Sequence, residues 1–430
     1  MDTTTPRFDP KRLQQATHGL LLYRSIWNHD VGSAWLYLVD VVSSSALDAT
    51  ELLAAYGLWF EAVAGTGKSW PDLLVELLLG STNPFSQQAQ QPEQRDFSEP
   101  ILAAVRQDLQ RLQYLYHLPL DQLAAWIQGT TGLPEPPVVW QLPSHGLSPP
   151  APDFATTQDW TTLVPELIQY YRQRGVGVLA QYSVLRWNND GLQGTPTPDP
   201  VQLDQLVGYD NQKQQLVQNT QFLLQGYPAL NVLLYGSRGT GKSSLIKALV
   251  NAYAAEGLRL IEVPKQDLQH LPHILEQVRG VPQKVIIFVD DLSFEEDDDV
   301  FKALKVVLEG GTTARPTNVV VYATSNRRHL IREFFDERPR PQTSDEIHQW
   351  DTVQEKLSFS DRFGLTLTFE PTDQTKYLEI VRHLAQQAKI SLSDTELDFR
   401  ARQWATRHNG RSGRTAQQFV TWLQAEQATS

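Results

Sequence analysis

The sequence contains no cysteine and only one methionine among its 430 residues. The lack of cysteine excludes disulfides, thiolate metal sites and cysteine nucleophiles. No apolar run approaches the ~18 residues that suggest a membrane-spanning helix, and the N-terminus lacks the apolar core of a signal peptide. We therefore expect a cytoplasmic protein without a membrane segment.

Positive charge is scarce in the first half of the chain. Residues 1–200 carry 20 acidic and 11 basic side chains, so they contribute −9 to the net charge of −12. Nonspecific binding of nucleic acid depends on clustered Lys and Arg side chains. The composition therefore argues against a DNA-coating role, and nucleic acid is the less expected partner.

Residues 1–199 are predicted to be a mostly helical N-terminal region. Stretches such as ATELLAAYGLWFEAVA and WPDLLVELLLG place apolar residues three and four positions apart. Eight of the eleven tryptophans precede residue 200, which favours packing within a core, with an aromatic docking surface as the alternative. We expect this region to act as an adaptor for an unidentified protein partner.

The pattern changes after residue 200 to alternating strands and helices. Apolar, β-rich segments at 231–236, 258–263, 284–290, 318–324 and 365–369 are mostly separated by helical segments. This alternation predicts an α/β fold, in which helices cover both faces of a parallel sheet. Such sheets bind ligands at the carboxyl ends of their strands.

The strongest motif is GSRGTGKS at residues 236–243, which matches G-x-x-x-x-G-K-[ST] between a predicted strand and a predicted helix. Its glycines allow several backbone N–H groups to point at one phosphate, and the helix N-terminus adds partial positive charge. Lys242 should bridge the β- and γ-phosphates, and Ser243 should ligate Mg²⁺. The residues expected to contact the nucleotide here are Gly236, Ser237, Arg238, Gly239, Thr240, Gly241, Lys242, Ser243 and Ser244.

A second glycine-rich segment, GTGKS at residues 65–69, is a decoy. Ala62 occupies the position of the leading glycine, and the segment follows a helical pattern instead of a buried strand. We predict that it is a turn that ends a helix.

Acidic and polar residues follow two of the predicted strands. VIIFVDD ends on Asp290, which would hold Mg²⁺ mostly through water, and on Asp291, which would orient the attacking water. Asn326 in YATSN would lie between these motifs, where it could contact that water or cap the following helix.

Two arginines are further candidates. Arg362 lies in SDRFG, and Arg414 lies in GRSGRTA with Arg411 as the alternative. An arginine near the γ-phosphate stabilises the charge that develops during transfer. Taken singly, each arginine favours a structural role over a catalytic one.

Together, these motifs resemble the AAA+ superfamily. GSRGTGKS resembles Walker A, VIIFVDD Walker B, ATSN sensor 1, SDRFG the arginine-finger box and GRSGRTA sensor 2. Val207 and Gly208, in LVGY, are similar to the segment that cups adenine. More narrowly, LVGYDNQKQQL, NVLLYGSRGTGKSSLIKAL and LSDRFGL look like the bacterial domain-of-unknown-function family 815.

The resemblance implies an AAA+ core with a five-stranded parallel sheet at residues 200–371 and a helical lid at 372–430. It implies ATP and Mg²⁺ as ligands, and a homo-oligomer such as a hexamer in which Arg362 reaches a neighbouring subunit's site. AAA+ proteins usually carry Glu at the position of Asp291, although Asp is usual in family 815. The expected function is Mg²⁺-dependent ATP hydrolysis that remodels or assembles a macromolecular partner. The alternatives are an ATP-binding switch with little turnover and a DNA-directed loader.

Overall fold

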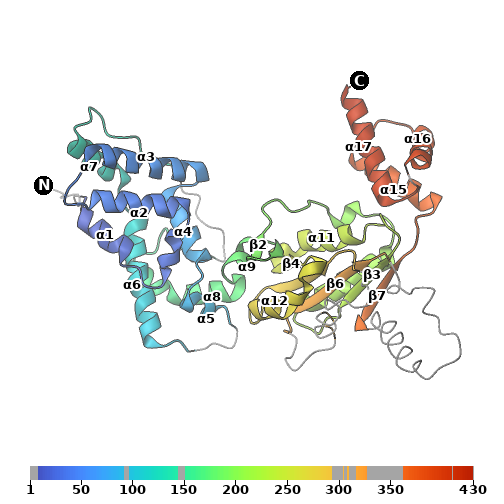
Figure 1. Ribbon diagram of the computed structural model, residues 1–430, viewed down its shortest axis with the longest axis horizontal. Helices are drawn as coiled ribbons and strands as arrows, with labels where there is room; N and C mark the ends of the chain where they lie inside the picture. The colour runs from blue at the N-terminus through green and yellow to red at the C-terminus, as the bar shows by residue number, and fades with distance from the viewer. Residues whose placement is uncertain are drawn as a thin grey trace, which may run out of the picture. The chain divides into compact units, whose positions relative to one another are not determined.

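The computed structural model describes residues 8–91, 96–143, 151–292, 304, 308, 316–326, 362–408 and 410–429. The expected insertion at 336–357 and the acidic run at 295–299 lie outside the described residues. The chain divides into two compact units, Met1–Gln181 and Tyr182–Ser430 (Figure 1). Each unit has its own hydrophobic core.

The first unit is helical in its described part. Its α-helices are α1 (Pro10–His18), α2 (Asp30–Val42), α3 (Ala49–Thr66), α4 (Trp70–Gly80), α5 (Pro84–Ala89), α6 (Glu99–Tyr116), α7 (Leu120–Thr131), α8 (Val164–Arg174) and α9 (Val178–Gln181).

The segment with the decoy motif connects two of these helices. Helix α3 ends at Gly67, which adopts a left-handed φ of 66° that costs glycine little. The Ser69 side chain then accepts a hydrogen bond from the Asp72 N–H and caps α4. The prediction of a helix-terminating turn is therefore confirmed.

Tryptophans form the centre of this helical core. Trp27, Trp35, Trp59 and Trp70 are buried, and the ring centroids of Trp35 and Trp70 lie 4.5 Å apart. Trp126 and Trp140 are half-buried and pack against the same core. Aromatic contacts of this kind add stability beyond the burial of apolar area. The interpretation that the early tryptophans pack within a core is confirmed.

One buried carboxylate connects α6 to the turn that follows α1. Asp108 on α6 accepts the backbone N–H groups of Leu21, Leu22 and Tyr23 at 2.8–3.1 Å. Burial raises the pKa of Asp108, and these hydrogen bonds and the nearby Arg111 guanidinium oppose that rise. The carboxylate thus satisfies three backbone donors of this turn, of which the Tyr23 N–H is buried.

The second unit is built on a seven-stranded sheet with the order β2-β1-β4-β5-β6-β3-β7. The α/β fold class is confirmed, but the expected number of five strands is wrong, because β2 and β1 extend the sheet beyond β4 and pair with each other antiparallel. The five expected strands are all present and parallel. The strands are β1 (Val184–Asn188), β2 (Gly191–Gly194), β3 (Val232–Gly236), β4 (Leu258–Glu262), β5 (Lys284–Val289), β6 (Val319–Ser325) and β7 (Leu365–Phe369).

The added hairpin also affects where the two units meet in sequence. We expected the N-terminal region to extend to residue 199, whereas β1 and β2 belong to the sheet and so to the second unit. Its strands are short, and β1 alternates buried Leu185 and Trp187 with the exposed Arg186. Such short alternation is typical of a half-buried strand.

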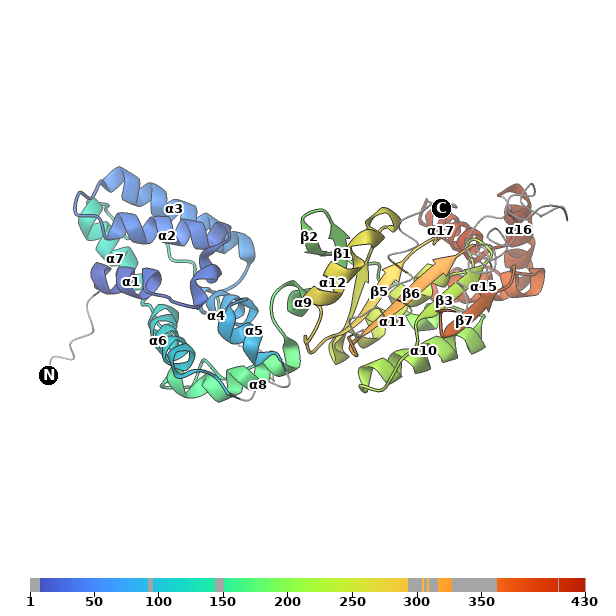
Figure 2. The same cartoon turned by 60° about the horizontal axis from the view of Figure 1, so that its bottom comes forward.

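Helices cover both faces of the sheet (Figure 2). Helices α10 (Asp210–Leu224) and α11 (Lys242–Tyr253) share one core with β3, β4, β5, β6 and β7. Helix α12 (Leu271–Gln277) lies on the other side. Within the described part of the chain, no helix combines the length and apolar character that a membrane crossing requires.

The last three helices form a small bundle with a separate core. They are α15 (Gln374–Gln387), α16 (Asp394–Arg407) and α17 (Gly413–Thr429). Tyr377, Val381, Ala401 and Phe419 are buried between them. Asp373 and Ser393 cap the first two helices by accepting backbone N–H groups. These helices occupy the segment in which a helical lid was expected.

Candidate functional site

The loop between β3 and α11 depends on three glycines with positive φ, a backbone conformation that favours glycine. Gly236, Gly239 and Gly241 have φ values of 140°, 75° and 90°. A Cβ at Gly236 would lie 1.9 Å from the carbonyl oxygen of Phe369 on the neighbouring β7. Ser237 donates its backbone N–H to that same oxygen at 3.2 Å. The loop therefore curls tightly against the carboxyl edge of the sheet, as a phosphate-binding loop must.

Lys242 begins α11 and turns its ammonium group back into the loop. Its Nζ donates to the carbonyl oxygens of Gly236 and Ser237, both at 2.8 Å, and lies 3.4 Å from the Asn326 Oδ1. Burial lowers the pKa of Lys242, and the carboxylates of Asp290 and Asp291 partly oppose that effect. The Lys242 ammonium in this position is suited to contact with an anionic ligand. Such a ligand would stabilise the protonated form of the lysine.

Asp290 follows β5, and its carboxylate accepts hydrogen bonds from two hydroxyl groups. Ser243 donates its Oγ–H to Asp290 Oδ1 at 2.7 Å, and Thr324 on β6 donates to the same oxygen at 2.5 Å. Among the described residues, no group of three or more His, Asp or Glu side chains could enclose a metal ion. Mg²⁺ commonly binds through one or two carboxylates together with substrate phosphates and water. The Ser243–Asp290 pair fits that mode.

Asp291 adopts an unusual backbone conformation, with a φ of 50°. Its N–H donates to Thr324 Oγ1 at 2.9 Å, and its Oδ1 accepts from Asn326 Nδ2 at 2.5 Å. Left-handed φ is uncommon outside glycine and is tolerated best by Asn and Asp. These two contacts stabilise the strained backbone conformation. The second one orients the short carboxylate toward Asn326.

Sequence reasoning missed Thr324, which contacts both acids. Side chains two residues apart in a strand share a face. Thr324 stands two residues before Asn326, so the strand period was the signal that could have identified it.

A cleft of about 1300 Å³ extends from the loop to the C-terminal helices. Val207 and Gly208 line it together with the glycine-rich loop. Next to them, Tyr209 takes a φ of 58° and its hydroxyl donates to the Glu370 carbonyl oxygen at 2.5 Å. The Lys376 ammonium of α15 lies 3.8 Å from the Tyr209 ring centroid, a cation–π contact between the sheet domain and the helical bundle.

The two sensor 2 candidates lie in different places. Arg414 lines the cleft, and its backbone N–H donates to the Gly239 carbonyl oxygen at 3.3 Å. Arg411 instead donates to Gln374 Oε1 at 3.0 Å and is not among the described residues that line the cleft. The geometry therefore places Arg414, and not Arg411, at the cleft.

Two parts of the cleft wall were not anticipated from the sequence. The stretch around Pro200 and Val201 lines the cleft, because Asn251 on α11 donates to the carbonyl oxygens of Asp199 and Val201 at 2.8 and 2.7 Å. The other part is an apolar wall on the three C-terminal helices. It consists of Ile380, Leu384, Trp404, Val420 and Trp422.

Arg362 lies away from these residues. It is half-buried, precedes β7 and is not among the described residues that line the cleft. Strands β7 and β3 are parallel, with Leu365 opposite Val232. Arg362 therefore lies at the amino edge of the sheet, a strand length of about 16 Å from the carboxyl edge that holds the loop. Asp361, the other polar residue of that motif, lies outside the described residues.

The strand order, the glycine-rich loop after β3, the acids after β5 and the C-terminal helical bundle define a P-loop fold of the AAA+ type. Residues 180–427 match the family described as "Protein of unknown function (DUF815)". The chain belongs to this family, as its motifs led us to expect.

Solved structures resemble the chain only weakly. The RuvB Holliday junction branch migration motor of Thermotoga maritima is 16% identical over 53% of this chain and 72% of that chain, with a TM-score of 0.33. The replication initiator DnaA bound to AMPPCP and single-stranded DNA is 17% identical over 53% and 66%, with a TM-score of 0.35. These likenesses are too weak to bear on function. No curated protein matches the chain.

The loop geometry predicts graded effects of two glycine substitutions. Gly236→Ala should lower the local stability of the loop and β3 by about 3 kcal/mol or more, because positive φ and a clash with backbone combine. Gly241→Ala should cost only about 1 kcal/mol, because its Cβ would meet no atom within 4 Å and only φ is strained. Hydrogen exchange of the β3 amides in increasing urea measures both. Equal protection in the two variants would contradict the described loop conformation.

Proposed function

We propose that this chain binds Mg²⁺–ATP at the glycine-rich loop and hydrolyses it to ADP and phosphate. The observation that carries the proposal is the meeting of Lys242, Ser243, Asp290, Asp291 and Asn326 at one carboxyl edge, in one cleft. In this arrangement Lys242 binds the β- and γ-phosphates, and the loop N–H groups surround the remaining phosphate oxygens.

The bound Mg²⁺ would supply charge neutralisation between the phosphates. Ser243 and Asp290 are the residues that would hold it, and Thr324 keeps Asp290 in position through the hydrogen bond between their side chains. Asp291 accepts a proton from, or orients, the attacking water, and Asn326 fixes the direction of that carboxylate. Arg414 adds positive charge from the lid side of the cleft.

We propose further that the site is completed by a second copy of the chain. Arg362 belongs to the arginine-finger motif, yet it lies at the amino edge of its own sheet, on the far side from Lys242. An arginine there suits contact with the site of a neighbouring subunit in a ring such as a hexamer. The helical unit, Met1–Gln181, would serve as the region that recruits the macromolecular partner to be remodelled or assembled.

A second candidate is an ATP-dependent switch with little turnover. The observation that favours it is Asp291, whose carboxylate is shorter than that of Glu and is engaged by the Asn326 amide at 2.5 Å. A carboxylate held in this way could support binding while slowing attack by water. Steady-state phosphate release separates the two candidates, because the switch predicts tight ATP binding with negligible release.

Replacing Lys242 tests nucleotide binding. Lys242→Ala removes the charge-assisted hydrogen bonds to the phosphates and should weaken ATP affinity by about 100-fold or more. Lys247→Ala is the matched control, because Lys247 lies on the same helix and its ammonium pairs with Asp199 at 3.6 Å. Titration with a fluorescent ATP analogue measures both. Retained affinity in Lys242→Ala would refute the proposed site.

Replacing Asp291 separates binding from chemistry. Asp291→Asn keeps an oxygen for the Asn326 contact but loses the negative charge, so ATP affinity should change little. Phosphate release should fall by about 10²-fold or more, the usual contribution of a general base. Single-turnover assays with radiolabelled ATP provide the measurement. If turnover is unaffected, another group activates the water.

Mixing two inactive variants tests the shared site. Arg362→Ala should suppress hydrolysis by about 10³-fold while sparing ATP binding. Adding Lys242→Ala subunits should restore part of the activity, because they provide Arg362 to intact loops. Subunits with both substitutions provide neither component and serve as the control. Recovery with the double variant, or none with either, would rule out action in trans.

A further inference from the structure

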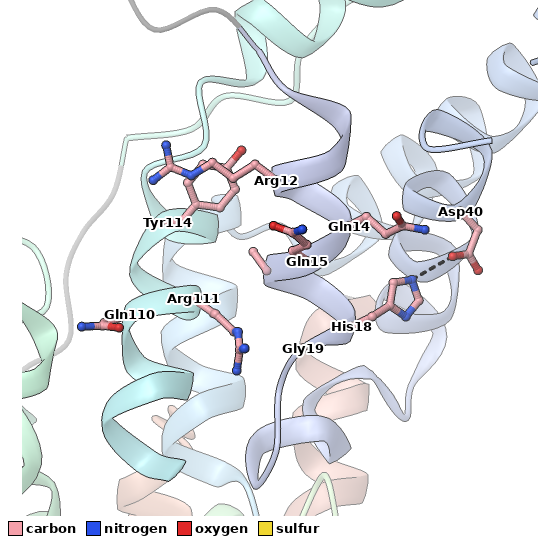
Figure 3. Close-up of a pocket in the computed structure, with 10 residues that line it drawn as sticks. Arg12, Gln14, Gln15, His18, Gly19, Asp40, Gln110, Arg111 and Tyr114 are labelled. Carbon is pink, nitrogen blue, oxygen red and sulfur yellow. Dashed lines mark hydrogen bonds and ion pairs between the residues drawn. The ribbon is translucent and has the colours of Figure 1, made fainter. Parts of the chain in front are cut away.

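Two arginines line one polar groove on the helical unit. It lies between α1, the end of α2 and α6, and has a volume of about 770 Å³ (Figure 3). Residues 1–200 are strongly acidic overall, so two guanidinium groups that line one groove are a local exception. The side chains used in the argument are Arg12, Gln15, His18, Asp40, Arg111 and Tyr114.

Arg111 keeps unused hydrogen-bonding capacity. Its Nη1 atom is buried and has no hydrogen-bond partner within the part of the chain that the structure describes. The nearest carboxylate oxygen, Asp108 Oδ1, lies 3.7 Å away, beyond hydrogen-bond range. Asp108 already accepts three backbone N–H groups. Arg111 therefore balances the charge of Asp108 without donating a hydrogen bond to it.

Gly19 allows this position of the Arg111 guanidinium. A Cβ at residue 19 would lie 2.8 Å from Arg111 Nε and 2.9 Å from its Cζ. The guanidinium thus lies directly against the chain at the end of α1, where a Cβ would also lie 2.4 Å from the Gln15 carbonyl oxygen.

Arg12 presents a second guanidinium to the same groove. Its Cζ lies 4.5 Å from the ring centroid of Tyr114, a cation–π contact that uses the flat face of the group. The N–H edges stay available for an acceptor. Figure 3 shows this pair at one end of the groove, Gln15 between it and Arg111, and His18 bonded to Asp40 at the other end.

We propose that this groove binds an oxyanion, either a phosphoryl or a carboxylate group of a partner. His18 and Asp40 satisfy each other at 2.8 Å, and Asp108 is buried beneath Arg111 with its acceptors in use. Among the described residues that line the groove, the two guanidinium groups then remain the charged donors. Both ligand groups accept paired N–H donors from arginine. The Arg111 side chain is 26% exposed, so its N–H groups on the groove side can donate to such a ligand while Nη1 stays next to Asp108.

This inference does not depend on nucleotide binding, because the groove lies in the other unit. The test uses the full-length chain with Lys242→Ala, which removes the loop ammonium as a competing anion site. Inorganic phosphate and succinate are titrated separately by calorimetry. We expect saturable binding of at least one probe, and the tighter probe identifies the phosphoryl or carboxylate source.

Gln15→Glu is the decisive variant in that background. It places a negative charge in the groove without removing either arginine or disturbing Asp108, and should weaken binding by about tenfold or more. Gln107→Glu is the matched control, because it makes the same change at an exposed position of α6 outside the groove. Its affinity should stay within about twofold of the parent.

A second pair of variants removes charge instead of adding it. Arg111→Gln should also weaken binding about tenfold, whereas Arg106→Gln, at an exposed α6 position where the arginine pairs with Glu99 at 3.0 Å, should not. Near-ultraviolet circular dichroism verifies that Arg111→Gln is folded. The proposal is overturned if neither probe binds, if Gln107→Glu weakens binding as much as Gln15→Glu, or if folded Arg111→Gln binds normally.

Discussion

The buried ammonium of Lys242 is the constraint around which the second unit is arranged. Its hydrogen-bond acceptors are two neutral carbonyl oxygens of the loop and an amide oxygen, while the nearby carboxylates act only through space. Removing a cation from water is expensive unless opposite charge is close. The glycine-rich loop, the acids after β5 and the open cleft together keep the Lys242 charge next to a space in which an anion fits.

Thr324 is the centre of the polar network at the sheet edge. Its hydroxyl donates to Asp290 and accepts from the Asp291 N–H, so a single side chain positions both acids. The strained φ of Asp291 persists because Thr324 and Asn326 hold it on two sides. Two parallel strands, β5 and β6, end together here, and their register brings these groups within hydrogen-bond distance.

The sequence predicted those elements whose own residues form a recognisable local pattern. The buried β3, β5 and β6, the glycine-rich loop and the turn at Gly67 depend on apolar runs and on backbone freedom, which the sequence displays directly. The β1–β2 hairpin, the apolar wall with Trp404 and Trp422, and the contact from Asn251 depend on how distant segments pack. Arg111 likewise resembles any helical surface arginine until Gly19 and Asp108 are seen beside it.

The hydrogen bond from the Arg414 N–H to the Gly239 carbonyl oxygen directly connects two regions that are far apart in sequence. Gly239 sits in the middle of the glycine-rich loop, and Arg414 in the first turn of α17. A loop that reshapes itself around an anion must carry that carbonyl with it, and the first turn of α17 must either follow or lose its partner. Any displacement of the loop at Gly239 would therefore act on the first residues of α17 through one backbone hydrogen bond, without an intervening side chain.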